Sequence, residues 1–255
     1  MIEKYNFRHD LLDEKAISAR IRLENPANEA QVWRQKESGI LIMLSTAGFE
    51  IYPSYDSPTI PIFYEEQAQE LAGFLNMHPP YTVIGMPELL QPMFPYLQND
   101  YTYQIAEMAS LKKSVQMPDA DDIRFAKYED IREIYDFLSG IKEFTMPEYE
   151  EFEYTVYRRS VNKTGRFCFT LCDGEIAATA ASMAESNSAA FLYSVASAEK
   201  FRGRGLAKKN VCALCATLQR EGKTPYIRYV NPAAKALYVK IGFTRVCDVA
   251  IMNPQ

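Results

Sequence analysis

The chain has 255 residues, more than the usual size of one domain, so two domains of comparable size are expected. Hydrophobic residues make up 47% of the chain and charged residues 24%, proportions typical of a globular protein and not of a disordered one. The net charge of -5 argues against nucleic acid as the main partner, because binding to a phosphate backbone depends on clustered Lys and Arg.

The N-terminal segment carries charges where a signal peptide needs an unbroken apolar stretch. No apolar run elsewhere approaches the length that spans a membrane. We therefore expect a cytoplasmic protein with no membrane partner. The sequence does not distinguish a monomer from a homodimer.

The first half of the chain shows a faint alternation of strands and helices. Strands are expected over residues 39–45, 49–54 and 81–85, and helices over 61–76 and 86–98. A polar, proline-containing stretch follows. We place the domain boundary there and expect an N-terminal domain over residues 1–117 and a C-terminal domain over 118–255.

The second half begins with a short strand-like run and a helical pattern that places Ile131, Ile134 and Leu138 on one face. Strand-like runs follow over 165–172 and 175–185. They are separated by Asp173-Gly174, a dipeptide suited to a tight hairpin because it tolerates positive φ.

A third strand is expected over residues 189–197, and the remainder alternates between helix and strand over 206–222, 225–230, 231–243 and 244–252. Antiparallel hairpins followed by this alternation predict an α+β (mixed α/β) domain around one central sheet. The fainter order of strands and helices in the first half suggests a domain of related structure, although no sequence repeat proves it.

All five cysteines lie in the second half, and an odd number cannot be fully paired within one chain. Reduced thiols are therefore expected. Cys212 and Cys215 have the spacing of a redox pair but fall in the middle of a predicted helix, which favours buried core residues. The two histidines, His9 and His78, lie in the other half, so we expect no metal site.

The segment from Lys200 to Lys209 follows a strand and opens a helix. Gly203 and Gly205 let the backbone take positive φ and let a ligand approach without a Cβ in its way. The free N–H groups and the positive dipole end of the helix would suit a diphosphate, and the nearby Lys and Arg add charge. A solvated basic turn is the alternative interpretation of these residues taken alone.

Two motifs together are more specific. Arg202, Gly205 and Ala207 form an RxxGxA pattern after the predicted strand, and the block NPAAKALYVKIGF follows over residues 231–243. This arrangement over about residues 121–255 resembles the GNAT superfamily of acyl-coenzyme A dependent N-acyltransferases, and within it the glycine N-acyltransferase-like branch. Together with the fainter strand and helix order of the first half, this predicts two GNAT-like domains, of which the first lacks the motif and helps to shape the acceptor site. Each would have a central, mostly antiparallel sheet flanked by helices.

The resemblance also implies a coenzyme site, with acetyl-coenzyme A or another acyl-coenzyme A as co-substrate. Backbone groups of Val195, Ala196 and Ser197 would pair with the pantetheine arm like an added strand. Asn231 matches an asparagine that contacts the pantetheine, and it also suits a helix N-cap before Pro232. The diphosphate would be held by the turn and helix start formed by Arg202, Gly203, Arg204, Gly205, Leu206, Ala207 and Lys208.

Tyr238 matches the family tyrosine that protonates the departing coenzyme thiolate. It also belongs to a helical stripe with Ala234, Leu237 and Ile241, on which a tyrosine is often a core residue. Gly242 and Phe243 suit a glycine C-cap followed by an apolar anchor.

The predicted strand over 191–197 lacks the glutamate that some family members use as a general base. Glu143, Glu175 or water could serve, or the neutral amine could be selected from solution. Residues 143–153 mix carboxylates and aromatics where the family builds part of its acceptor pocket, which suits a cationic amine. A solvated acidic helix explains the same residues.

The sequence thus predicts an N-acyltransferase acting on a small-molecule or peptide amine. A module that binds acyl-coenzyme A without turnover, as a sensor or scaffold, is the alternative. The motifs do not identify the acceptor or the acyl length.

Overall fold

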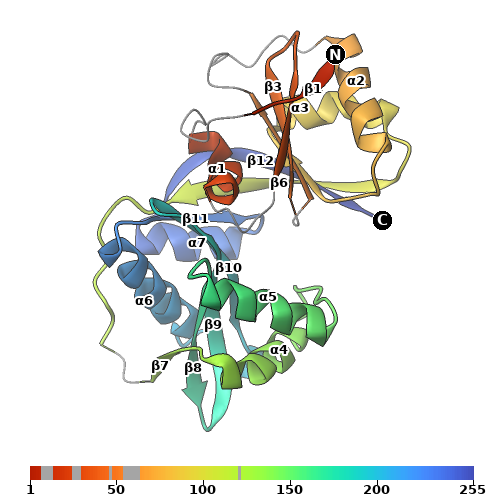
Figure 1. Ribbon diagram of the computed structural model, residues 1–255. Helices are drawn as coiled ribbons and strands as arrows, with labels where there is room; N and C mark the ends of the chain where they lie inside the picture. The colour runs from red at the N-terminus through yellow and green to blue at the C-terminus, as the bar shows by residue number, and fades with distance from the viewer. Residues whose placement is uncertain (7–13, 25–29, 46–47, 54–63, 120–121) are drawn as a thin grey trace. The chain divides into compact units, whose positions relative to one another are not determined.

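A computed structural model describes residues 1–6, 14–24, 30–45, 48–53, 64–119 and 122–255. The chain forms two compact units (Figure 1). Unit 1 comprises Met1–Met108, Arg228–Asn231 and Arg245–Gln255, and unit 2 comprises Ala109–Ile227 and Pro232–Thr244. The C-terminal eleven residues thus group with the first unit, whereas the predicted boundary between residues 117 and 118 assigns them to the second domain. That division into domains stays a prediction.

The sheet of unit 1 is mostly antiparallel, with the strand order β1-β2-β3-β4-β5-β12-β6. Only the β4–β5 pair is parallel among the neighbours whose register is described. The strands are β1 (Ile2–Lys4), β2 (Gln31–Gln35), β3 (Ile40–Ser45), β4 (Gly48–Pro53), β5 (Val83–Gly85), β6 (Tyr101–Ser110) and β12 (Thr244–Pro254).

The helices of unit 1 pack their apolar residues into the core of that sheet. They are the 3-10 turn η2 (Glu14–Ala16), α1 (Ile17–Leu23), α2 (Glu65–Asn76), α3 (Pro87–Leu90) and the 3-10 helix η4 (Gln91–Tyr96).

The strands expected over 39–45, 49–54 and 81–85 are present as β3, β4 and β5, and the helix expected over 61–76 as α2. The expected start of that helix, residues 61–63, lies outside the described residues, as does His9. The single helix expected over 86–98 is wrong: α3 ends at Leu90 and a 3-10 helix follows. Pro92 and Pro95 lack the N–H that α-helical bonds need, which explains the break.

The sheet of unit 2 carries the candidate site. Its strand order is β11-β10-β9-β8-β7, antiparallel throughout except for the parallel β10–β11 pair. The strands are β7 (Ile123–Phe125), β8 (Arg166–Cys172), β9 (Glu175–Glu185), β10 (Ala189–Ser197) and β11 (Thr224–Tyr229). The expected β8–β9 hairpin is confirmed: Asp173 and Gly174 have φ values of 54° and 81°.

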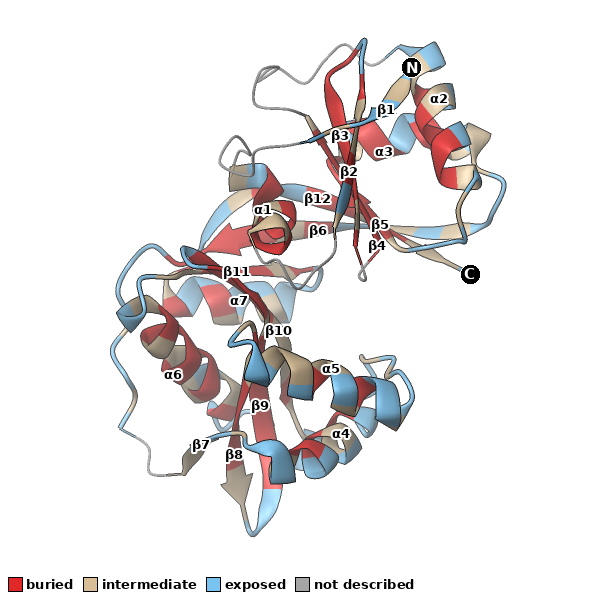
Figure 2. Cartoon of the chain, in the orientation of Figure 1, coloured by how far each residue is buried: buried red, intermediate tan, exposed pale blue. Residues whose placement is uncertain are grey.

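The helices of unit 2 cover the two faces of this sheet. They are η5 (Tyr128–Asp130), α4 (Ile131–Ser139), α5 (Tyr149–Val161), η6 (Glu199–Phe201), α6 (Leu206–Arg220) and α7 (Pro232–Ile241). On β8, Phe167 and Phe169 pack in one core with α4 and α5, whereas Cys168 and Thr170 bond to Asn210 of α6. Successive side chains of a strand point to opposite faces, so α6 lies across the sheet from α4 and α5. Figure 2 shows the buried strands and the buried inner side of α6.

Asn210 anchors α6 one turn after its start. The residue is fully buried, its Nδ2 donates to the Ala178 carbonyl at 2.8 Å, and its Oδ1 accepts from Thr170 Oγ1 at 2.8 Å. A buried amide whose donor and acceptor are both satisfied holds one orientation. Asn210 therefore positions the N-terminal end of α6 against the sheet.

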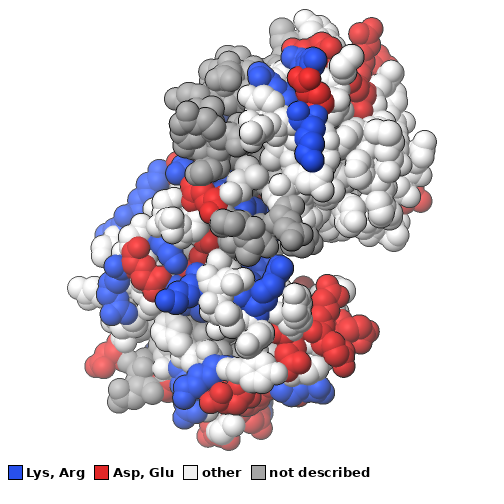
Figure 3. Space-filling model, viewed as in Figure 1, with Lys and Arg blue, Asp and Glu red and all other residues white. Residues whose placement is uncertain are grey.

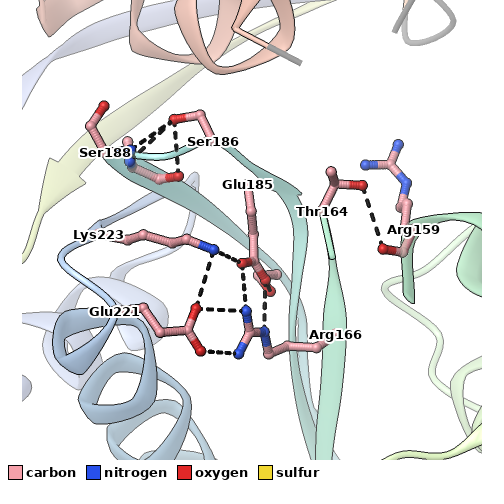
Figure 4. Close-up of polar contacts among 10 residues, drawn as sticks. Arg159, Thr164, Arg166, Glu185, Ser186, Ser188, Glu221 and Lys223 are labelled. Carbon is pink, nitrogen blue, oxygen red and sulfur yellow. Dashed lines mark hydrogen bonds and ion pairs between the residues drawn. The ribbon is translucent and has the colours of Figure 1, made fainter. Parts of the chain in front are cut away.

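The C-terminal end of α6 is held by four charged side chains that point toward one another (Figure 4). The fully buried carboxylate of Glu185 accepts from Arg166 at 2.8 Å and from Lys223 at 2.6 Å. Glu221, just after α6, also bonds to Arg166 at 2.6 Å. These bonds join the end of the helix to β8 and β9.

We predict that Glu185→Gln lowers the free energy of unfolding by about 3 kcal/mol, because Arg166 and Lys223, both partly buried, lose the negative charge that neutralises them. Urea denaturation measures the loss. The control is Glu221→Gln, which removes a carboxylate that is 39% exposed and should cost less than about 1 kcal/mol. Equal losses for the two variants would contradict the assignment of Glu185 as the central charge.

The same cluster sets a pH dependence. Hydrogen bonds from Arg166, and then from Lys223, lower the pKa of Glu221 from its ordinary value. A carboxyl group whose pKa is lower in the folded chain stabilises the fold above its unfolded pKa, and this contribution is lost as the pH falls through the folded pKa. Acid should therefore loosen the C-terminal end of α6.

All five cysteines are free thiols, as expected. Burial raises the pKa of Cys168 to about 12, and burial raises the pKa of Cys215 well above its ordinary range. Thiols of this kind are poor nucleophiles, which supports a core role for Cys215 in its CxxC pair. Across the described parts of the chain, no helix has the length and apolar character needed to cross a membrane.

Candidate functional site

The glycine turn, which is the segment over residues 200–209, joins β10 to α6 as predicted. Gly203 and Gly205 have φ values of 80° and 77°, and among the described residues no heavy atom beyond their chain neighbours lies within 4 Å of the place where a Cβ would stand. Positive φ strains any other L residue, so the two glycines set the path of the turn. The open space above them leaves the backbone accessible.

The N-terminal end of α6 presents unpaired amides. Gly205 is the N-cap residue in a left-handed conformation, and no side chain among the described residues caps the helix there. The first amide with a backbone acceptor is that of Lys209, which donates to the Gly205 carbonyl at 3.1 Å. Within the described chain, the amides from Gly203 to Lys208 have no such acceptor, and together with the helix dipole they favour an anion.

Two apolar anchors hold the turn on the sheet. Phe201 and Leu206, on either side of the glycines, are 5% and 7% exposed and pack against Ala177 and Ala178 of β9. The alanines leave room for this close packing. The turn is therefore fixed at both ends while its middle stays exposed.

The cations at the turn fall into two groups. Lys200 pairs with Glu175, and Arg202 Nη2 pairs with Glu143 at 3.1 Å. Arg204 lies over the Phe201 ring at 5.2 Å, and neither Arg204 nor Lys208 forms an ion pair with any residue described. Of these four side chains, Arg204 and Lys208 are the two that are directly available to an anion in this arrangement.

Strand β10 changes its pairing where the candidate pantetheine segment begins. Tyr193 pairs with Ala181 and Ala196 with Thr179, so β10 has one extra residue there, a β-bulge with Ser194 at φ 50°. Thr179 Oγ1 donates to the Ser194 carbonyl at 2.8 Å and supports the bulge.

On its other edge, β10 pairs with β11 only over Ala189–Phe191. From Leu192 onward, β9 is the one strand with a described register to β10. Val195, Ala196 and Ser197 thus lie on a strand segment that has separated from its parallel neighbour. Such an edge can pair with an extended ligand through backbone hydrogen bonds.

The remaining predicted site residues lie on or before α7. Asn231 is exposed and precedes Pro232, the first residue of α7. Tyr238 is 4% exposed and contacts the Phe243 ring edge-on at 5.5 Å between centroids. The expected C-cap is present, with Gly242 at φ 112° and its amide donating to the Tyr238 carbonyl at 3.1 Å. Asn231 belongs to unit 1 and Tyr238 to unit 2.

The acidic and aromatic segment predicted near the acceptor pocket forms the α4–α5 connection and the start of α5. Phe152 and Val156 are buried, and acidic side chains gather over α5 (Figure 3). Tyr128 and Tyr149 both donate to Glu153, at 3.1 and 2.8 Å. Both features agree with an acidic surface helix whose apolar side faces the core.

A surface pocket of about 380 Å³ lies beside this connection and the start of η6. Its apolar part is lined by Phe137, Ile141 and Ile176, and its polar lining includes Glu175 and Lys200. The pocket therefore adjoins the lead-in to the glycine turn.

The structural role of Asn210 and the pairing of Arg202 and Lys200 with carboxylates were not predicted from the sequence. A polar residue inside an otherwise apolar helical stripe is a local signal for Asn210. No local signal reveals the Glu143–Arg202 pair, because the two residues are 59 positions apart.

The FR47-like protein family model matches residues 169–250, which include β10, the turn, α6 and α7. No curated protein matches the chain. Among solved structures, a GCN5-related N-acetyltransferase from Kribbella flavida is 12% identical, with 96% of this chain and 97% of that chain covered and a TM-score of 0.61.

Two further similar structures are a GCN5-related N-acetyltransferase-like protein from Streptococcus suis and an acetyltransferase from the GNAT family of Colwellia psychrerythraea. The first is 13% identical over 94% of this chain and 98% of that chain, with a TM-score of 0.57. The second is 13% identical over 100% of both chains, with a TM-score of 0.55. At these identities the comparison shows the fold, and the chain has the GNAT fold predicted from its motifs.

Proposed function

We propose that this chain is an acyl-coenzyme A dependent N-acyltransferase that moves an acetyl or similar acyl group onto an amine. The glycine turn between β10 and α6 is the observation that carries the proposal. Over residues 200–209 it combines two positive-φ glycines and open space with amides that lack backbone acceptors and two cations, Arg204 and Lys208, that lack ion-pair partners among the described residues. A diphosphate needs this combination of donors and positive charge.

The residues present fit coenzyme A. Arg202, Gly203, Arg204, Gly205, Leu206, Ala207 and Lys208 would hold the diphosphate. Val195, Ala196 and Ser197 would pair with the pantetheine, and Asn231 would contact it. The bound coenzyme supplies an activated acyl group as a thioester.

In the proposed reaction the neutral amine attacks the thioester carbonyl, a C–N bond forms and the C–S bond breaks. The amine loses one proton and the thiolate takes one up, so the products are an amide and free coenzyme A. Tyr238 is the proposed donor to the thiolate, which leaves more readily with a positioned acid.

No dedicated base is assigned. Strand β10 carries no carboxylate, and the two candidates, Glu143 and Glu175, are exposed and paired with Arg202 and Lys200. These same observations favour the second candidate function, a module that binds acyl-coenzyme A without turnover.

Incubation with acetyl-coenzyme A and a panel of amines separates the two functions. A transferase should release free thiol at a rate that depends on the amine, with a matching amide product by mass spectrometry. A sensor should bind acetyl-coenzyme A in calorimetry and release no thiol above the background rate. Failure to bind acetyl-coenzyme A at all would exclude both.

A further inference from the structure

Two of the cations that lead into the glycine turn are already neutralised. Lys200 pairs with Glu175, whose side chain is 63% exposed, and Arg202 pairs with Glu143, whose side chain is 59% exposed. We call these two contacts the counter-ion pairs. Their carboxylates come from two separate places, the start of β9 and the α4–α5 connection.

Arg202 is held so that it can exchange partners. Its Nε donates to the Ser197 carbonyl at 3.3 Å, which keeps the guanidinium at the end of β10, and Nη2 alone reaches Glu143. Lys200 lies over the Phe201 ring at 5.1 Å, so its ammonium also stays beside the turn when its carboxylate leaves.

We propose that Glu143 and Glu175 occupy these cations until the coenzyme diphosphate displaces them, and that this displacement frees the α4–α5 connection. The proposal rests on the proposed coenzyme site. Exposed ion pairs contribute little stability, whereas phosphate oxygens form stronger, charge-assisted bonds to Lys and Arg. A diphosphate should therefore displace the carboxylates of Glu143 and Glu175.

The exchange has a consequence for the order of binding. Glu143 lies in the connection between α4 and α5, at the start of residues 143–153, where the family resemblance implies part of the acceptor pocket. While Glu143 is bonded to Arg202, that connection is tied to the coenzyme turn. Coenzyme binding breaks the tie, so the α4–α5 connection should move more freely once the acyl donor is in place.

The first test measures the affinity for coenzyme A by calorimetry at low salt. Glu143→Gln and Glu175→Gln should each bind about twofold to fivefold more tightly than the parent, since each removes a competitor of the phosphate. At about 1 M salt the gain should disappear because charges are screened.

Matched controls lie close to each position. Glu148→Gln removes one negative charge at the start of α5, and Asp173→Asn removes one at the β8–β9 hairpin, where Asn tolerates the positive φ. Neither carboxylate has a described partner among the ion pairs, so both variants should bind coenzyme A like the parent. Equal gains in these controls would reduce the effect to net charge and overturn the proposal.

The second test follows amide hydrogen exchange in residues 140–148. Saturating coenzyme A should speed exchange there in the parent and leave it unchanged in Glu143→Gln, whose connection is already released. Slower exchange on binding in the parent would overturn the proposal.

The outcomes also separate this proposal from the function on which it rests. If the parent binds coenzyme A and the two variants bind no more tightly, the counter-ion pairs are not displaced and the coenzyme site stands. If the parent does not bind coenzyme A, both proposals fail.

Discussion

Gly205→Glu should abolish coenzyme A binding, with a loss of affinity of at least about a hundredfold. The substitution places a side chain and a negative charge in the open space above the turn, where amides without backbone acceptors face the proposed diphosphate. Losing even one or two charge-assisted hydrogen bonds to phosphate accounts for a change of this size. Calorimetry with coenzyme A measures it directly.

The chain offers a matched control for this variant. Gly222, just after the other end of α6, has φ 79° and equally open surroundings. Gly222→Glu therefore introduces the same side chain, charge and backbone strain away from the proposed site, and it should keep the affinity of the parent. A folded Gly205→Glu variant that also kept that affinity would move the coenzyme site elsewhere.

Tyr238→Phe should lower kcat by about a hundredfold to ten-thousandfold while leaving the affinity for acetyl-coenzyme A nearly unchanged. The phenyl ring keeps the packing of Tyr238 against Phe243, and only the hydroxyl, the proposed proton donor, is lost. Steady-state thiol release, corrected for the folded fraction, gives the rate.

The comparison variant is Tyr52→Phe, which removes the hydroxyl of a tyrosine buried in unit 1; this hydroxyl is hydrogen-bonded to Ser18 at 3.2 Å and donates to the Glu50 carboxylate at 3.4 Å. It should cost about 1 to 3 kcal/mol of stability and leave kcat unchanged. If Tyr238→Phe behaves in the same way, Tyr238 is a core residue and the thiolate leaves without its help.

Local sequence patterns were sufficient for most elements of unit 2. Strand β10 has the predicted bounds of residues 189–197, and the Asp173-Gly174 hairpin is present. The glycine turn before α6 was also predictable. Each depends on conformational preferences of neighbouring residues: alternation for a strand and tolerance of positive φ for a turn.

In unit 1 the same reasoning found β3, β4, β5 and α2 but did not identify β1, β2, α1 or β6. The ten-residue strand β6 follows two prolines and a polar loop, and none of its first five residues is buried, so that part lacks the apolar face typical of a core strand. Its conformation depends on the neighbouring strand β12, which is more than 130 positions later in the chain. Pairing over that distance leaves no local pattern to read.

The sequence by itself determined the GNAT fold and the position of the glycine turn, because both depend on motifs of adjacent residues. Only the tertiary structure decided which cations of the turn are available. The sequence alone does not distinguish the four cations Lys200, Arg202, Arg204 and Lys208, yet the structure pairs the first two with carboxylates from β9 and the α4–α5 connection. The physical reason is that an ion pair requires two groups within a few ångströms, and folding alone brings Glu143 to Arg202.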